Sequence, residues 1–340
     1  IQRKIKLIGS KILERSYKEI NFWWIMLFKK PEFWDKKKSS LISILLSPLT
    51  IFIKLNNCLI NRSKKIKSKN IFSICVGNIY VGGTGKTPTT IKLFKIVHHN
   101  INRRVVTAKK FYRYQLDEEI LLRKKTKFLT GKNRLDIINT AKKNKNKIII
   151  FDDGLQEKKV DYNLKFVCFD SLKWIGNGKL FTSGPMREKV KSLTRFDGVF
   201  LKNINKPNFR IINLIKKINP KIKIYNSTYK IRNIKKFNLL NNYIIFSAIG
   251  NPESYKMLLK KYNFKIIKDI RFPDHYEFKN QDIEKIISSA KKLKAEIVTT
   301  EKDYVKIKKF YQKKIKCLEV DLKIQNEKNL IHFLKSKIYA

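Results

Sequence analysis

The sequence predicts an α/β protein, with helices on both faces of a parallel sheet and a smaller α/β unit after it. Short apolar runs alternate along the 340 residues with segments of helical periodicity, which is the pattern of strands joined by crossover helices. A glycine-rich loop lies between the first run of this core and the helix that follows it. Acidic or polar residues end several of the runs, as expected at the carboxyl edge of a parallel sheet.

The N-terminal segment is expected to stand apart from this core. Residues 1–30 are predicted to be an extension outside the functional fold, since the chain opens on Ile1 and the first motif begins at Pro31. Residues 39–53 carry no charge and have lysines on both sides, but they fall short of the roughly 20 apolar residues that cross a bilayer. We therefore expect a membrane-interfacial helical segment over residues 31–70. The alternative is a helix whose apolar face packs on the protein core.

The glycine-rich loop has the parts of a phosphate-binding loop. An apolar run at residues 71–76 is expected to be a strand and residues 89–97 a helix, and the loop lies between them. Backbone N–H groups of such a loop turn toward an anion, and the helix N-terminus adds positive potential. We expect Lys86 to reach the β- and γ-phosphates of ATP, and Thr87 to offer its hydroxyl to Mg²⁺. The residues expected to hold the nucleotide are Gly82, Gly83, Thr84, Gly85, Lys86 and Thr87.

The rest of the chain is expected to form a P-loop NTPase-like core over residues 71–230 and a smaller C-terminal α/β lobe over residues 231–340. Core strands are predicted at residues 105–108, 128–130, 147–153, 166–170 and 198–201. In the second lobe, strands are predicted at residues 243–249, 264–270 and 296–299, and helices at residues 253–262 and 281–293.

Two carboxylates end one of the core strands. Asp152 and Asp153 follow a run of four apolar residues, which is the arrangement that holds Mg²⁺ or its water shell beside a bound nucleotide. We expect these two residues and Thr87 to bind the metal.

A group that accepts a proton from the attacking hydroxyl is also needed. Asp117 and His275 are the candidates, and His275 lies on a predicted loop, where functional residues concentrate. An Asp–His pair drawn from the two lobes would orient and polarise a sugar hydroxyl. Arg187 is expected to bind a phosphate in a forked geometry, and Glu188 to hold that arginine or a metal.

The net charge of +50 would suit a nucleic-acid-binding protein, but the lysines are scattered along the whole chain. We expect no specific nucleic acid as partner, and we expect an anionic membrane surface to attract the protein. The four cysteines show no C-x-x-C pairing and are expected to be reduced thiols.

These segments, in this order, resemble the tetraacyldisaccharide 4'-kinase family, the lipid A kinases of Gram-negative bacteria. The resemblance covers about residues 31 to 310 and rests on Pro31-Glu-Phe-Trp34, the loop from Val76 to Pro88, Asp117-Glu118, Asp152-Asp-Gly-Leu-Gln156, Gly176-Asn-Gly178, Gly184-Pro-Met-Arg-Glu188, Phe272-Pro-Asp-His275 and Thr300-Glu-Lys-Asp303.

The resemblance implies an enzyme that transfers the γ-phosphate of ATP, with Mg²⁺, to the 4'-hydroxyl of a tetraacyldisaccharide 1-phosphate. It also implies a peripheral protein, expected to be a monomer, on the cytoplasmic face of the bacterial inner membrane. The residues that it marks as catalytic are Asp117, His275 and Lys86. The residues that it marks as substrate-binding or supporting are Glu118, Arg134, Gln156, Arg187 and Glu188.

The chain departs from the family pattern between Thr107 and Leu116. The family usually has Ser-Arg-Gly-Tyr-Gly after the second strand, whereas this chain has Thr-Ala-Lys-Lys-Phe-Tyr-Arg, which leaves Lys109, Lys110 or Arg113 to supply the charge. The alternative function is a partner-dependent P-loop ATPase or GTPase switch that acts without a sugar acceptor. The additional loops at Asp152, Arg187 and His275 argue against that alternative.

Overall fold

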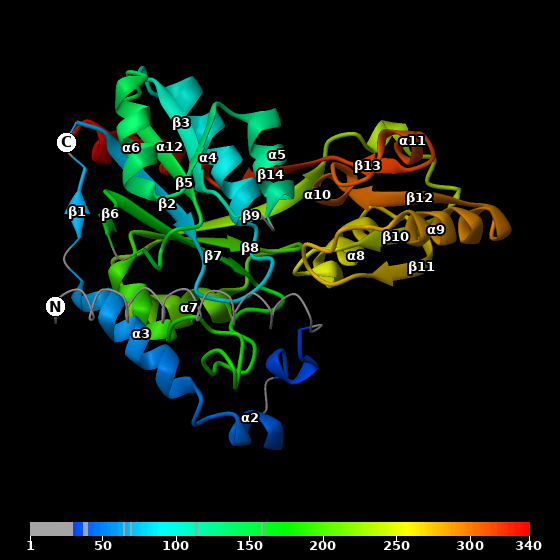
Figure 1. The fold of residues 1–340 in the computed structure, drawn as a ribbon, viewed down its shortest axis with the longest axis horizontal. Helices are drawn as coiled ribbons and strands as arrows, with labels where there is room; N and C mark the ends of the chain where they lie inside the picture. The colour runs from blue at the N-terminus through cyan, green and yellow to red at the C-terminus, as the bar shows by residue number, and fades with distance from the viewer. Residues whose placement is uncertain (1–29, 37–39, 64, 69, 113–114, 158) are drawn as a thin grey trace, which may run out of the picture.

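The chain folds into a large lobe and a small lobe (Figure 1). The computed structural model describes residues 30–36, 40–63, 65–68, 70–112, 115–157 and 159–340. The expected N-terminal extension, residues 1–30, therefore lies outside the described residues except for Lys30. Arg113 also lies outside them.

The large lobe is built on one eight-stranded sheet. Its strands are β2 (Phe72–Gly77), β3 (Val105–Lys110), β4 (Phe128–Gly131), β5 (Ile148–Asp152), β7 (Leu164–Asp170), β8 (Gly198–Lys202), β9 (Lys223–Ile231) and β14 (Val320–Ile324). Their spatial order is β14-β9-β8-β7-β2-β5-β3-β4, and every neighbouring pair is parallel except β14 with β9. The strand before the glycine-rich loop, β2, thus lies between β5 and β7.

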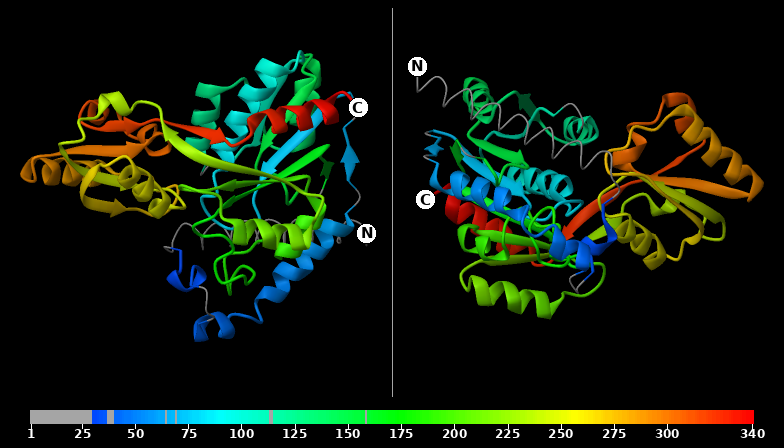
Figure 2. Two further views of the ribbon diagram at one scale, coloured as in Figure 1. Left: turned by 180° about the vertical axis from the view of Figure 1, so that it is seen from behind. Right: turned by 60° about the horizontal axis from the view of Figure 1, so that its bottom comes forward.

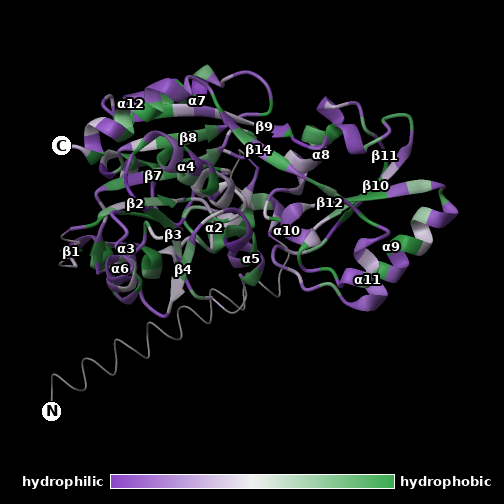
Figure 3. Cartoon of the chain, turned by 90° about the horizontal axis from the view of Figure 1, so that it is seen from above, coloured by the Kyte–Doolittle hydropathy of each residue, from purple (hydrophilic) through white to green (hydrophobic). Residues whose placement is uncertain are grey.

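Helices cover both faces of this sheet. The helices of the large lobe are α3 (Thr50–Arg62), α4 (Lys86–Asn100), α5 (Leu116–Lys125), α6 (Arg134–Lys143), α7 (Phe209–Ile218) and α12 (Glu327–Ile338). Along β2, Ile74 and Val76 point into the core shared with α4 and α12, while Cys75 points into the core shared with α3, α6 and α7. This alternation follows from the pleat of a strand buried on both faces. The strands are mostly hydrophobic, and helices such as α6, α7 and α12 mix both kinds of residue (Figure 3). The predicted α/β fold is confirmed.

Short elements complete the large lobe. The strands β1 (Ile66–Lys67) and β6 (Val160–Asp161) form a separate parallel pair. A 3-10 helix, η2 (Val190–Arg195), precedes β8.

The N-terminal segment forms two helices that are separated around Pro48. After the 3-10 helix η1 (Glu32–Trp34), the helix α2 (Leu41–Leu45) ends just before Pro48, and α3 starts at Thr50. Ile53 and Ile60 of α3 are buried, so one side of this helix packs on the large lobe. No helix in the described ranges has the length and apolar character needed to cross a bilayer.

The small lobe, residues 232–319, contains a second parallel sheet. Its strands are β10 (Asn242–Ser247), β11 (Lys265–Arg271), β12 (Ala295–Thr300) and β13 (Lys316–Leu318), in the order β11-β10-β12-β13. Its helical segments are η3 (Ile234–Lys236), α8 (Pro252–Lys261), α9 (Asn280–Lys292), α10 (Glu301–Tyr304) and α11 (Lys309–Gln312). Two hydrophobic cores lie on the two faces of this sheet.

The end of the chain differs from the predicted division. Residues 231–340 were expected to form the smaller lobe, but β14 returns to the large sheet and α12 packs against α4 (Figure 2). The antiparallel pair β9–β14 therefore carries the chain into the small lobe and back out again. The reason is pairing: Leu322 and Ile324 of β14 are buried on the large lobe, and so are Leu330 and Leu334 of α12. The other predicted boundaries stay predictions.

Aromatic packing in the large lobe provides a test of the fold. Phe166 is 0% exposed, and its ring lies 5.2 Å from that of Phe200, centroid to centroid. We expect Phe166→Ala to lower the free energy of unfolding by about 3–5 kcal/mol, because it leaves a cavity that the rigid sheet cannot fill. Urea unfolding followed by tryptophan fluorescence would measure this. The matched control is Phe209→Ala, at a side chain that is 70% exposed, which should change stability by less than about 0.5 kcal/mol. Equal effects of the two substitutions would contradict the described core.

Candidate active site

A large cleft runs between the two lobes where the strands β2, β3 and β5 end. Its volume is about 2590 Å³, well above the roughly 300–1,000 Å³ that is usual for small-molecule pockets. The glycine-rich loop, the ends of the core strands, the first turn of α8 and parts of α3 all line it. Of the residues predicted from the sequence, those that line the cleft are Gly82, Gly83, Thr84, Gly85, Lys86, Thr87, Glu118, Arg134, Asp153, Gln156, Arg187 and His275.

Glycine is required at one point in the glycine-rich loop and at one point in the small lobe, where that lobe meets the loop. Gly85 precedes the first residue of α4 with φ 88°, and a Cβ on it would lie 3.1 Å from the hydroxyl of Tyr229. In the small lobe, a Cβ on Gly250 would lie 2.2 Å from the amide nitrogen of Gly83. The small lobe thus touches the loop directly, and the N-terminus of α4 points its free N–H groups at the cleft.

Asp152 ends β5 at the foot of the loop. Its carboxylate accepts hydrogen bonds from the hydroxyls of Thr87, at 2.8 Å, and of Thr90, at 3.2 Å. Burial raises the pKa of Asp152, and the nearby ammonium of Lys109 only partly offsets this effect.

Asp153 is the more accessible of the two acids, and it faces cations. Its Oδ2 lies 3.6 Å from Nζ of Lys86 and 3.4 Å from Nη1 of Arg187. Burial opposes its ionisation, but Lys86 and then Arg187 outweigh burial and hold the pKa of Asp153 below its usual value. Its φ of 61° is uncommon for a residue other than glycine, so the Asp-Asp-Gly turn is held by its surroundings.

The departure from the family pattern after the second strand places a lysine inside the site. Lys109, the penultimate residue of β3, bonds to Glu118 of α5 and lies 3.5 Å from Oδ2 of Asp152. Its side chain is 3% exposed. Burial lowers the pKa of this lysine, but Glu118 and Asp152 more than compensate, so the pKa is raised. Of the three cations that the sequence left open, Lys109 is therefore the one described beside the acids.

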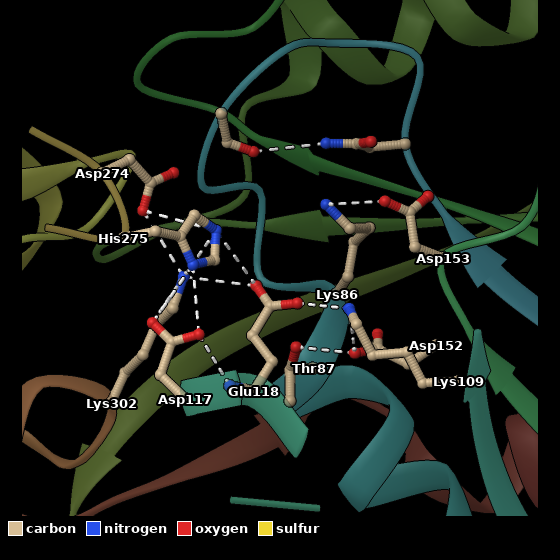
Figure 4. Close-up of polar contacts among 12 residues, drawn as sticks. Lys86, Thr87, Lys109, Asp117, Glu118, Asp152, Asp153, Asp274, His275 and Lys302 are labelled. Carbon is tan, nitrogen blue, oxygen red and sulfur yellow. Dashed lines mark hydrogen bonds and ion pairs between the residues drawn. The ribbon is translucent and has the colours of Figure 1, made fainter. Parts of the chain in front are cut away.

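Asp117 and His275 meet across the two lobes (Figure 4). Nδ1 of His275 lies 3.1 Å from each carboxylate oxygen of Asp117, whose side chain is buried in the first turn of α5. Burial opposes ionisation of Asp117, but Lys302 and the hydrogen bond with His275 hold its pKa below the usual value. The structure thus brings the expected pair together, while the role of each residue stays a prediction.

Sequence reasoning missed Lys302, which lies at the centre of this cluster. Its ammonium is 3.2 Å from Oε1 of Glu118, 3.4 Å from Oδ1 of Asp274 and 3.3 Å from Nε2 of His275. Lys302 belongs to the Thr300-Glu-Lys-Asp303 match to the family pattern, and that match was its signal in the sequence. Thr300 caps α10 by accepting a bond from the amide of Asp303, but neither feature shows where the side chain of Lys302 points.

Three further predicted residues, Arg134, Gln156 and Glu188, bond to the acids or to one another. Arg134 donates to the carbonyl oxygen of Asp153 at 2.6 Å and pairs with Glu157. Gln156 donates to Oε1 of Glu188 at 3.0 Å. Glu188 is buried and also pairs with Arg195, and its link to Arg187 runs through Gln156, whose Oε1 lies 3.4 Å from Nη1 of Arg187.

The model of the family described as tetraacyldisaccharide-1-P 4'-kinase matches residues 42–339. The chain belongs to this family. A tetraacyldisaccharide 4'-kinase of Pelagibacter ubique is 42% identical over 309 residues, which are 91% of this chain and 98% of the relative. One of Rickettsia conorii is 34% identical over 320 residues, 87% of this chain and 94% of the relative.

A solved structure shares the fold. It is the crystal structure of the "apo" form of LpxK from Aquifex aeolicus in complex with ATP, with a TM-score of 0.63 and 20% identity, covering 88% of this chain and 100% of that one. The predicted resemblance to the tetraacyldisaccharide 4'-kinase family is therefore confirmed, and with it the α/β fold. The chain covers nearly the whole length of these relatives.

The buried lysine offers a stability test. We expect Lys109→Met to lower the free energy of unfolding at neutral pH by about 3–5 kcal/mol, because Glu118 and Asp152 would stay buried without their cation. Thermal or urea unfolding would measure the loss. Lys142→Met on the exposed face of α6 is the control with the same change in charge, and it should be nearly neutral.

The stability that the Lys109–Glu118 pair contributes depends on pH, and the direction of that dependence can be predicted. Burial opposes ionisation of Glu118, but Lys109 and then Lys302 hold its pKa well below the usual value. The stability from this pair is therefore present above the unfolded pKa, about 4.3, and is lost as the pH falls through the lower folded pKa. We expect the difference in the free energy of unfolding between the wild type and Lys109→Met to become smaller in that acidic pH range. A difference that grows on acidification would contradict the ion pair.

Proposed function

We propose that this chain transfers the γ-phosphate of ATP to the 4'-hydroxyl of a tetraacyldisaccharide 1-phosphate, a step of lipid A biosynthesis. One observation carries the proposal beyond family membership. His275, whose Nδ1 lies 3.1 Å from Asp117, and the phosphate loop with Lys86 line one cleft, so a single cleft has room for both an acceptor hydroxyl and a terminal phosphate.

The nucleotide end of the cleft is suited to a triphosphate. The backbone from Gly82 to Thr87 and the start of α4 offer N–H groups to phosphate oxygens. Lys86 lies at that end, and the 3.6 Å contact with Asp153 holds its ammonium over the loop. Arg187 stands on the other side of Asp153, so two cations can share the charge of the transferred group.

The donors at the foot of the loop fit Mg²⁺. Thr87 and Asp152 supply a hydroxyl and a carboxylate 2.8 Å apart, which are the hard oxygen donors that this ion prefers. Within the described ranges no three His, Cys, Asp or Glu side chains form a metal cage, and Mg²⁺ at nucleotide sites usually completes its shell with phosphates and water. We assign Thr87 and Asp152 as the residues that would hold it, with Asp153 beside them. When bound, the ion would neutralise charge on the transferred phosphate.

Asp117 is the residue proposed to accept the proton of the 4'-hydroxyl. Its lowered pKa keeps it a carboxylate at neutral pH, so it is a good hydrogen-bond acceptor but a weak base. That suits phosphoryl transfer, because in a loose transition state the hydroxyl needs orientation more than early deprotonation. His275 holds the carboxylate in place from the small lobe.

The lipid end of the cleft is apolar and lies on the N-terminal helices. Leu46, Leu49, Phe52, Leu55 and Leu59 line the cleft there. All but the first are among the exposed large hydrophobic side chains of the described residues.

The neighbouring residues Leu41 and Leu45 are 80% and 78% exposed. We propose that this apolar surface of α2 and α3 lies in the cytoplasmic leaflet of the inner membrane, since ATP is supplied from the cytoplasm. The strong positive charge of the chain favours an anionic bilayer.

The reaction is tested by incubating the purified protein with ATP, Mg²⁺ and the disaccharide 1-phosphate in detergent micelles. We expect a bis-phosphorylated lipid. Asp117→Asn should lower kcat by about 10²–10⁴-fold, since it removes the proton acceptor, and should leave ATP binding nearly unchanged. Asp136→Asn on α6, an exposed carboxylate, is the matched control. ATP hydrolysis at the same rate without the lipid would favour the switch alternative, and full turnover by Asp117→Asn would refute the assignment of Asp117.

Membrane attachment is tested with vesicles of phosphatidylethanolamine and phosphatidylglycerol. We expect Phe52→Glu with Leu55→Glu to reduce co-sedimentation by at least about tenfold, because two large apolar side chains then no longer enter the bilayer. Phe310→Glu in the small lobe, where the side chain is 68% exposed, is the control and should co-sediment as the wild type does. Loss of binding with both variants, or with neither, would contradict the proposed surface.

A further inference from the structure

Lys302 joins the two lobes at the Asp–His pair. It belongs to α10 of the small lobe, as Asp274 and His275 belong to the loop before α9. From there its ammonium reaches Glu118 at 3.2 Å and Asp117 at 3.8 Å, both on α5 of the large lobe. Its side chain is 19% exposed, so most of it has left water.

The chemistry of an ammonium fixes the direction of its bond to the imidazole. A lysine that carries its charge has three donors and no acceptor. Burial lowers the pKa of Lys302, but Asp274, then Glu118 and Asp117, more than compensate, so it is held charged. Nε2 of His275, 3.3 Å away, must therefore accept when the ring is neutral. The ring proton is then on Nδ1, which lies 3.1 Å from Asp117 and donates to it.

We propose that Lys302 is a positioning residue of the phosphoryl transfer: it holds His275 in the Nδ1–H tautomer, so that His275 orients Asp117 toward the acceptor hydroxyl. This inference rests on the proposed function, since it presumes that Asp117 receives the hydroxyl proton. The backbone of His275 supports it. With φ 62°, this residue is held in a strained conformation that fixes where the ring points.

Lys302 also adjusts the acidity of Asp117. The groups that face this carboxylate are His275, Lys302 and Lys306 from the small lobe and Glu118 from its own helix. Lys306 is 3.8 Å from Asp117 but is shared with Asp303 at 2.8 Å, so it does not replace Lys302. Removal of the Lys302 ammonium should raise the pKa of Asp117, because burial would then oppose its ionisation with less compensation.

The tautomer can be observed without any change at Lys302. The chain has four histidines. ¹⁵N-histidine labelling of the full chain, with NMR spectra recorded at rising pH until the ring-nitrogen shifts become constant, separates the two neutral tautomers by those shifts. His275→Gln assigns the signal by its loss. The Nδ1–H tautomer is expected in the wild type. The Nε2–H tautomer would overturn the inference, whatever the activity of the enzyme.

Kinetics test the consequence. For Lys302→Gln we expect kcat to fall by about 10²-fold, because a small misplacement of Asp117 relative to the hydroxyl is that costly. We expect the KM for ATP to stay within about twofold of the wild-type value. In the plot of kcat against pH, the acidic limb should move to higher pH by about one unit. Lys302→Arg, which keeps the charge, should recover most of the lost kcat and most of the wild-type position of the acidic limb. Lys308→Gln is the control, because Lys308 is exposed and the substitution removes the same charge.

The outcomes separate this inference from the proposed function. A wild type without kinase activity would refute the function, and the NMR result would still decide the tautomer. An active wild type together with Lys302→Gln of unchanged kcat and unchanged acidic limb would overturn the inference alone. A fall in kcat with no shift of the limb and no recovery by Lys302→Arg would mean a merely structural residue, and it would overturn the inference as well.

Discussion

A line of alternating charges buried in the cleft links the two lobes, and the arrangement of the site depends on it. Asp152 at the phosphate loop contacts Lys109, Lys109 bonds to Glu118, and Glu118 bonds to Lys302 of the small lobe. Lys302 then contacts Asp274. Each charge has an opposite neighbour, so none is buried alone, which is the condition for keeping such groups out of water. The line also sets distances, because moving either lobe would break a buried pair.

Strain accompanies this network at two residues that line the cleft. Asp153 and His275 both have positive φ, at 61° and 62°. Each such residue costs on the order of 1–3 kcal/mol, which the packing around it must supply. At Asp153, Arg134 holds the carbonyl oxygen from behind, while Lys86 and Arg187 hold the carboxylate. The result is a carboxylate and an imidazole whose directions are set before any ligand arrives, and fixed groups lose little freedom when they bind.

Local patterns in the sequence predicted much of the fold. Apolar runs gave the strands β2 and β5, and the glycine-rich loop was located from its glycines and the helix behind it. The return of β14 to the large sheet was missed, because an antiparallel partner more than eighty residues away leaves no local trace. The same limit applies to the site. Asp117 and His275 were paired both from the need for a group that accepts a proton and from the family resemblance, whereas the role of Lys109 as a bridge depends on where α5 packs over β3.

Lys302 shows why polar networks are harder to predict than strands. It belongs to the family match Thr300-Glu-Lys-Asp303, yet its partners come from α5 and from the loop before α9. Nothing in a single sequence states which of 77 Lys and Arg residues will meet three carboxylates. Only the relative placement of two lobes decides that, and it is a property of tertiary packing.

The proposed membrane contact would place the apolar end of the cleft at the bilayer and the phosphate loop in water, and energetics support that arrangement. Extracting an acyl chain from a bilayer into water costs about 0.8 kcal/mol for each CH₂, so a substrate with four acyl chains cannot leave the membrane to be phosphorylated. On the proposed function, the enzyme would instead bring its phosphate loop to the bilayer surface. The N-terminal helices provide such a connection, because Asn57 of α3 donates to the carbonyl oxygen of Arg187 at 2.8 Å and Ser43 donates to that of Ser183 at 2.7 Å. The loop that carries Arg187 is thereby tied to the same helices whose other side is apolar and exposed.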